Sequence, residues 1–292
     1  MDKPIYRDWN RGQLDAQLNL RARWPEHAVF FEKWAATSRK LREDLPVRTD
    51  LAYGSSSGER LDLFVPEGAQ EAPLHVFIHG GYWQSLDKSD FSFLAPDYLE
   101  RGIAFASLNY DLAPKARVGE MVMQVRRAVA WLHRNAGKHR IDAGRIFVSG
   151  HSAGGHLAAM TLLSDWAAFD LPADTVKGVC AVSGIYELEP IRLSYHQPVV
   201  QLTPEDVDAL SPLRNQPASA TPLVLAVGGE ETEEFHLQQA ELAERWSAAG
   251  VPLAEISVPG RHHFDIVEDL GDPGQALGAA MFGLIQSGAV SA

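Results

Sequence analysis

A serine flanked by glycines is the most distinctive chemical feature of this 292-residue sequence. Gly150-His151-Ser152-Ala153-Gly154 follows the apolar run Ile146-Phe147-Val148 and precedes a stretch of helical character that begins near Gly155. A G-x-S-x-G pattern between a strand and a helix predicts a sharp, strained turn that exposes a serine nucleophile. The first backbone N–H groups of the helix would face the same point and favour an oxyanion there. We therefore expect Ser152 to attack a carbonyl carbon, with the N–H of Ala153 as one oxyanion donor.

A serine hydroxyl also needs a base that removes its proton. Where the serine lies on such a strand-to-helix turn, the base is a histidine that comes last in the chain, after the last strand. Of the eleven histidines, only His262 and His263 follow the last predicted strand, in the loop Pro259–Asp265. The residues alone leave both open as the base. His79 and His151 precede the acid segment or flank the nucleophile, and we interpret them as scaffold.

The acid that orients the base should follow the strand that ends at Val227. Four glutamates, Glu230, Glu231, Glu233 and Glu234, compete for this role. Glu233 and Glu234 suit the first turn of a helix, where acidic side chains are favoured by the helix dipole. Glu230 and Glu231 lie closest to the strand end, so a carboxylate of either can reach an imidazole.

A pair of glycines completes the set of chemical motifs. His79-Gly80-Gly81-Tyr82-Trp83 follows the apolar strand His75–Ile78. Adjacent glycines at that position allow backbone N–H groups to approach a substrate oxygen. We expect the N–H groups of Gly81 and Tyr82 to form an oxyanion hole together with that of Ala153.

The elements that must position these residues alternate between short strands and helices. Apolar or β-rich runs predict strands at 47–53, 60–65, 74–78, 103–109, 145–149, 176–182, 222–227 and 253–258. Amphipathic stretches predict helices at 91–101, 120–135, 156–164 and 235–249. The first two strands should form an antiparallel hairpin, and the other strands a mostly parallel, doubly wound sheet with helices on both faces. The expected fold class is α/β.

No linker divides the chain, so we expect a single domain over residues 1–292. We expect residues 1–45 to form a helical N-terminal extension. Spacings of three and four residues place a set of its side chains on one face of a helix: Val29, Phe30, Lys33, Trp34 and Leu41. Its aromatic residues would help to close the pocket over the site or pack on the sheet. They are Trp24, Phe30, Phe31 and Trp34.

Composition excludes several classes of function. With 46% hydrophobic and 22% charged residues, the chain is expected to be globular. A formal charge of −12 argues against nucleic acid and anionic membranes as partners. The longest nearly apolar stretch, Leu277 to Ile285, is far short of the ~20 residues of a membrane span. Cys180 is alone, no metal-site spacing occurs and the N-terminus is charged, so we expect a cytoplasmic protein without metal or cofactor.

Together these motifs resemble the kynurenine formamidase (arylformamidase) family of α/β-hydrolases. Residues 79–83 match the H-G-G-x-W signature, and the similarity continues through 150–160, 182–191, 201–206, 231–236 and 263–267. The resemblance implies an α/β-hydrolase fold. It also implies that Glu231, which precedes a T-x-E-F segment, is the acid, and that His263, which precedes Phe264, is the base. The family usually has aspartate where this chain has Glu231.

The resemblance implies a metal-independent serine hydrolase that cleaves N-formylkynurenine or a related aryl formamide to the amine and formate, through an acyl-enzyme on Ser152. Tyr82, Trp83 and Tyr186 are candidates to line an aromatic substrate pocket. A carboxylesterase for small acyl esters is the alternative, because the same residues cleave esters. A non-catalytic binding protein has no need of all these motifs together. The expected partner is a small aryl amide or ester, and a homodimer is left open.

Overall fold

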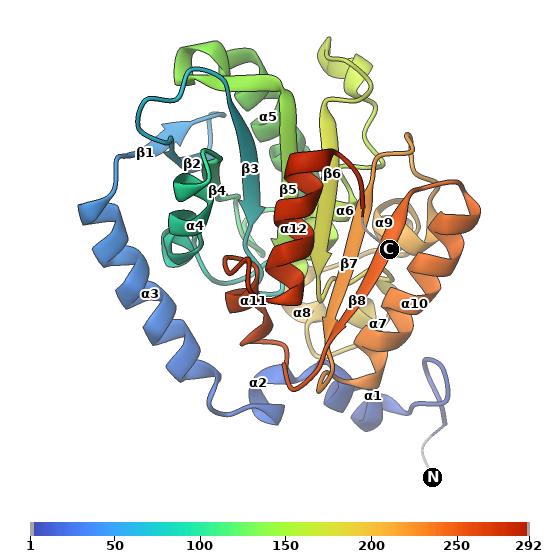
Figure 1. Ribbon diagram of the computed structural model, residues 1–292. Coiled ribbons are helices and arrows are strands. Elements are labelled where there is room, and N and C mark those ends of the chain that lie inside the picture. Colours follow the sequence, from blue (N-terminus) through green and yellow to red (C-terminus); the bar gives the residue numbers. More distant parts are fainter. Residues whose placement is uncertain (1–2, 291–292) are drawn as a thin grey trace.

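A single eight-stranded sheet lies at the centre of the protein (Figure 1). The computed structural model describes residues 3–290. Its strands are β1 (Val47–Ala52), β2 (Arg60–Phe64), β3 (Ala72–Ile78), β4 (Ala104–Leu108), β5 (Ile141–His151), β6 (Val176–Val182), β7 (Leu223–Gly228) and β8 (Leu253–Val258). They are ordered β1-β2-β4-β3-β5-β6-β7-β8. The pairs β1–β2 and β2–β4 are antiparallel and all other neighbours are parallel, which confirms the predicted hairpin and mostly parallel sheet.

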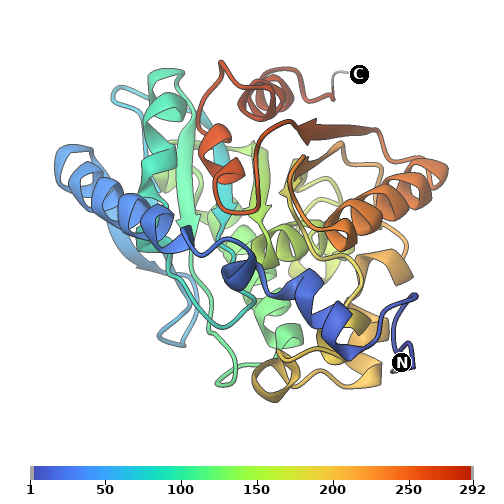
Figure 2. The ribbon, with the colours of Figure 1, turned by 90° about the horizontal axis from the view of Figure 1, so that it is seen from below.

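Helices cover both faces of this sheet, as predicted. The α-helices of the described residues are α1 (Arg11–Leu18), α2 (Leu20–Arg23), α3 (His27–Asp44), α4 (Ala95–Glu100), α5 (Val118–Asn135), α6 (Ala153–Ala159), α7 (Glu189–Arg192), α8 (Gln197–Val200), α9 (Pro204–Leu210), α10 (Glu233–Ala248), α11 (Ile266–Asp269) and α12 (Ala276–Ser287). Helices α4 and α12 lie on one face, and α5, α6 and α10 on the other (Figures 1 and 2). None of these helices combines the length and apolarity that crossing a membrane requires.

Burial from two sides explains the composition of the central strands. Every residue of β4 is buried, and its sequence Ala-Phe-Ala-Ser-Leu is almost entirely apolar. The helix α5 turns one stripe toward the sheet: Met121, Val125, Ala128 and Leu132 are buried at spacings of three and four residues. The amphipathic helix predicted at 120–135 is thus present in α5.

Some helices differ from the prediction. The stretch expected as one helix at 91–101 begins with a 3₁₀ turn, Ser92–Leu94, before α4. Three short helices, α7, α8 and α9, lie between β6 and β7 and had not been predicted. Each has a proline in its first turn, where the missing N–H costs no hydrogen bond. Helices this short show no amphipathic period, which explains why the sequence pattern did not reveal them.

The N-terminal extension crosses the end of the sheet at which the parallel strands finish. Helices α1 and α2 run below the carboxyl ends of the strands in Figure 1 and across them in Figure 2, and α3 continues along one side. The indole Nε1 of Trp34 donates to Glu268 Oε1 at 2.9 Å, and Ser38 Oγ donates to the Asp90 carbonyl at 2.8 Å. Val29, expected on the same helix face as Trp34, is 64% exposed, and the buried residues of α3 are Trp34 and Ser38.

Candidate active site

Ser152 occupies a strained turn between β5 and α6. Its backbone angles are φ 57° and ψ −120°, in a region that costs energy for a residue with a side chain. Its N–H donates to the Val182 carbonyl at 2.8 Å. The flanking glycines are required by close packing: a Cβ atom at Gly150 would lie 2.1 Å from the Gly154 carbonyl oxygen, and one at Gly154 would lie 2.0 Å from that of Ile78. The G-x-S-x-G pattern thus has a steric cause at both glycines.

His263 and Glu231 form a buried pair at the ends of neighbouring strands. His263 Nδ1 lies 2.7 Å from Glu231 Oε2, so we assign the ring proton to Nδ1, which leaves Nε2 as an acceptor. The two other candidates are placed differently. Glu230 is exposed, and His262 Nδ1 accepts the backbone N–H of Phe264 at 3.0 Å.

The second carboxylate oxygen of Glu231 is also held. Oε1 accepts a short hydrogen bond from the Ser183 hydroxyl and a 3.1 Å hydrogen bond from the Gly228 N–H. Ser183 has φ 49°, a left-handed conformation that aims its hydroxyl across the strand ends. Sequence reasoning did not identify Ser183, although a serine directly after a buried strand, at the edge where the other site residues gather, was a signal for it.

His151 lies against His263. Its Nε2 donates to the His263 carbonyl oxygen at 2.8 Å, and the two ring centres are 4.8 Å apart. Burial, and then the proximity of His263, hold the pKa of His151 well below its ordinary value. His151 is therefore neutral at pH 7, and it lines the cavity while its ring donates to the His263 backbone.

The loop after β3 lies on the same cavity as Ser152, with Gly81 and Tyr82 among the lining residues. Gly81, Tyr82 and Trp83 have successive φ values of 104°, 49° and 56°. A Cβ atom at Gly81 would lie 2.2 Å from the Ser85 carbonyl oxygen, so only glycine fits there. Within the described residues the N–H groups of Gly81 and Tyr82 have no acceptor. The N–H of Ala153 is in the first position of α6, where helices leave N–H groups unpaired.

A cavity of about 360 Å³ lies beside Ser152 and His263. Its wall includes Ser152, His263, Gly81 and Tyr82. The N-terminal extension supplies a further part of it: Asn19, Leu20, Arg21, Phe31 and Trp34. Trp24 and Phe30, for which closing the pocket and packing on the sheet were both left open, contact His262 with ring centres 5.3 Å apart.

Two residues expected on the aromatic wall lie elsewhere. Trp83 is fully buried and packs edge-on against His156, with ring centres 5.2 Å apart. Tyr186 is 1% exposed and lies under Gly184, 2.5 Å from the position a Cβ atom would take there. Neither lines the cavity, whose aromatic residues are Phe31, Trp34, Tyr82, Tyr195 and Phe264.

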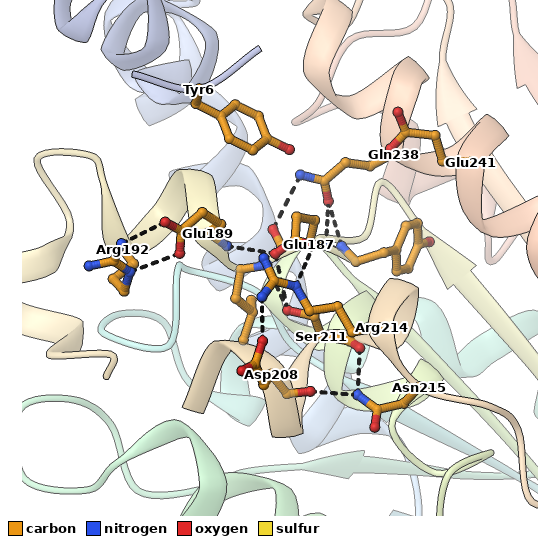
Figure 3. Close-up of polar contacts among 12 residues, drawn as sticks. Tyr6, Glu187, Glu189, Arg192, Asp208, Ser211, Arg214, Asn215, Gln238 and Glu241 are labelled. Atoms are coloured by element: carbon orange, nitrogen blue, oxygen red, sulfur yellow. Dashed lines mark hydrogen bonds and ion pairs between the residues drawn. The ribbon is translucent and has the colours of Figure 1, made fainter. Parts of the chain in front are cut away.

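A polar network fixes the segment that carries Ser183 against α10. Figure 3 shows Gln238 of α10 close to Tyr6 and Glu187. Gln238 Oε1 accepts the N–H groups of Tyr186 at 2.6 Å and Glu187 at 2.9 Å. Its Nε2 donates to Glu234 Oε1 at 2.6 Å, and Glu234 also accepts the Tyr6 hydroxyl at 3.0 Å. The segment around Tyr6, α10 and the segment after β6 are thereby joined beside the site.

Comparison with known proteins identifies the family. The family model described as BD-FAE matches residues 61–208. A kynurenine formamidase of Salmo salar is 31% identical, over 91% of this chain and 94% of that protein. One of Danio rerio is 34% identical, over 76% of each chain. The chain belongs to the kynurenine formamidase family of α/β-hydrolases.

Solved structures share the α/β-hydrolase fold of this member of the kynurenine formamidase family. A protein of Silicibacter sp. TM1040, provisionally named a thioesterase, is 32% identical with a TM-score of 0.81, over 92% of this chain and 99% of that one. An esterase of Pyrobaculum calidifontis shares the fold at 20% identity, with a TM-score of 0.71 over 91% and 94% of the two chains. This member of the kynurenine formamidase family is a hydrolase of the formamidase or esterase type.

Proposed function

We propose that this chain hydrolyses N-formylkynurenine, or a related aryl formamide, to the amine and formate through an acyl-enzyme on Ser152, without a metal ion. The observation that carries the proposal is the 2.7 Å hydrogen bond between His263 and Glu231. His263 lines the same cavity as the strained Ser152. The family of the chain supports a formamide as substrate.

In the first step, Ser152 Oγ attacks the formyl carbon while His263 Nε2 accepts the hydroxyl proton. The carbonyl oxygen becomes an oxyanion, and the N–H groups of Gly81, Tyr82 and Ala153 are the donors that would stabilise it. Each such donor typically contributes ~10² to 10³ in rate. Glu231 orients the imidazole and stabilises its positive charge.

In the second step, the C–N bond breaks and the leaving nitrogen takes the proton from His263. The formyl group then remains as an ester on Ser152. Water loses a proton to His263, attacks this ester and releases formate, and the proton returns to Ser152. Because the acyl part of a formamide is a single hydrogen on the carbonyl carbon, most of the cavity is available to the aryl amine.

A carboxylesterase acting on small acyl esters is the second candidate. The same groups cleave an ester, whose alkoxide leaves more readily than an amine. The provisional thioesterase name of the Silicibacter relative favours an acyl ester as the alternative substrate. In that case the acyl group, rather than the leaving group, would occupy the larger part of the cavity.

Labelling and product analysis test the proposal. A fluorophosphonate should modify the wild-type protein once, on the peptide that contains Ser152, and N-formylkynurenine should yield formate and kynurenine in equal amounts. Ser152→Ala should lose both the labelling and the products, and EDTA should leave the wild-type rate unchanged. Formate release that persists in folded Ser152→Ala, or that EDTA abolishes, would contradict the mechanism.

A further inference from the structure

Arg21 gives the cavity its fixed positive charge. Among the described residues that line the cavity, Arg21 is the only lysine or arginine, and none is aspartate or glutamate. Burial lowers the pKa of His196, on the same wall, to about 4, so His196 is neutral at pH 7. The cavity wall therefore provides one permanently positive side chain that can bind an anionic ligand. Its described residues provide no carboxylate that could bind a cationic one.

Contacts on two sides hold Arg21 in this position. Its Nη2 donates to Ser85 Oγ at 3.0 Å, and its guanidinium carbon lies 5.5 Å from the centre of the Phe31 ring. Ser85 Oγ in turn donates to the Gly81 carbonyl at 3.1 Å, so Arg21 links α2 to the loop of the candidate oxyanion hole. Ser85 is the only acceptor of Arg21 within the described residues, which leaves the other N–H groups of its planar fork free for a ligand.

The charge of the whole chain makes a local cation more important. The formal net charge of −12 disfavours the approach of an anionic substrate. An arginine at the cavity opposes this repulsion over a short range, and its fork matches the geometry of a carboxylate.

Resting on the proposed function, we infer that Arg21 binds a carboxylate of the substrate, so that the favoured substrates are aryl formamides with an anionic side chain. An ammonium group on the same side chain contributes little, because no carboxylate lines the cavity to receive it. Arg21 is thus a specificity-determining residue that the N-terminal extension supplies, and the substrate class is defined by its negative charge.

A pair of substrates with the same scissile bond tests this inference. N-formylkynurenine carries a carboxylate, whereas formanilide is neutral. Arg21→Met should lower kcat/KM for N-formylkynurenine by about tenfold or more and change that for formanilide by less than about threefold. Arg21→Lys should retain part of the preference, because it keeps the charge but not the fork. The analogue of N-formylkynurenine without its α-amino group should react at a kcat/KM within about threefold of the parent.

Arg23→Met is the matched control. Arg23 lies on the same short helix, its loss changes the net charge equally, and its guanidinium lies 5.1 Å from the Trp24 ring centre rather than on the cavity wall. It should leave kcat/KM for both substrates unchanged. An equal loss of kcat/KM on both substrates in Arg21→Met, or an equal effect of Arg23→Met, would exclude Arg21 as the residue that selects the carboxylate. A much lower kcat/KM for the analogue without the α-amino group than for N-formylkynurenine would show that the ammonium group does contribute.

Failure of the proposed function is distinguishable from failure of this inference. If wild type cleaves p-nitrophenyl acetate but not N-formylkynurenine, the proposed function is wrong, and inhibition of the ester reaction still tests Arg21. 4-Phenylbutanoate should then inhibit wild type more strongly than 4-phenylbutanamide, and Arg21→Met should remove that difference. Equal inhibition of wild type by the acid and the amide would overturn the role of Arg21.

Discussion

His263 Nδ1 and Glu231 Oε2 are 2.7 Å apart, although the two residues follow different strands, β8 and β7. In this chain, glutamate occupies the position at which the resembled family usually has the shorter aspartate. Ser183 and the Gly228 N–H hold Oε1, so the remaining oxygen is directed at the imidazole. Two anchoring donors offset the additional rotatable bond of glutamate.

Replacing Glu231 tests the role of this pair. In Glu231→Gln an amide can donate to Nδ1 and favour the wrong tautomer of His263, and it has no charge to stabilise the imidazolium. We expect kcat to fall by about 10³- to 10⁴-fold. Steady-state kinetics provide the measurement, with Glu230→Gln as an exposed control of unchanged rate. A Glu231→Gln enzyme with more than about a tenth of wild-type kcat would exclude Glu231 as the acid.

Ser183 should act as a positioning residue for Glu231. Ser183→Gly removes the hydroxyl but suits the left-handed backbone at φ 49°, so the protein should not become less stable. We expect kcat to fall by about tenfold at unchanged KM, because a hydrogen bond to a carboxylate is lost. Kinetics and urea unfolding of the same samples separate the two effects. Unchanged kcat, or a loss of activity that follows a loss of stability, would count against positioning.

Gly81→Ala tests the oxyanion loop. A Cβ atom there meets the Ser85 carbonyl, and the loop must move to relieve the contact. We expect kcat to fall by about 10²-fold or more as the backbone donors shift. Gly102→Ala is the control: Gly102 also has a positive φ, 74°, but open space around its Cβ position. Both variants carry backbone strain, so equal kinetic effects would contradict the assignment.

The buried His156 should make the stability depend on pH. Its Nε2 donates to the Leu210 carbonyl at 2.8 Å, and burial lowers its pKa to about 4. Between this pH and about 6.5, the unfolded chain binds more protons than the folded one, so the free energy of unfolding falls on acidification. His156 should contribute about 2 kcal/mol of the loss between pH 7.5 and pH 5.

Urea unfolding of wild type and His156→Gln at both pH values gives the comparison. Glutamine keeps a donor for Leu210 but does not titrate, so the variant should lose about 2 kcal/mol less than wild type between pH 7.5 and pH 5. Because the result is a difference between two proteins, the contributions of other titrating groups cancel. An identical loss in both would show that His156 does not carry this dependence.

Local patterns explain which features the sequence predicted. All eight strands were expected because each is a short apolar or β-rich run between turn residues. The strained turn at Ser152 was predicted because a single strand, turn and helix define its environment within a few residues. The choice of Glu231 over Glu230 came from the family resemblance and not from spacing, because both residues lie near the same strand end.

Contacts between distant segments explain what was missed. Ser183 bonds to a residue 48 positions away, and no local pattern encodes that pairing. Arg21 reaches the cavity because α2 crosses the end of the sheet, which periodicity within α2 does not reveal. Trp83 was expected to line an aromatic pocket for the leaving group, but the backbone turns sharply at Tyr82 and Trp83, and Trp83 lies in the core.

The most direct test of the central claim is the ratio of kcat/KM for N-formylkynurenine to that for p-nitrophenyl acetate, with Ser152→Ala as the blank. The formamide is intrinsically the less reactive of the two, so a preference for it must come from the enzyme. We predict that wild type prefers N-formylkynurenine by about tenfold or more, and that Ser152→Ala cleaves neither substrate. Turnover of the ester alone would contradict the formamidase assignment and leave a Ser152-dependent esterase.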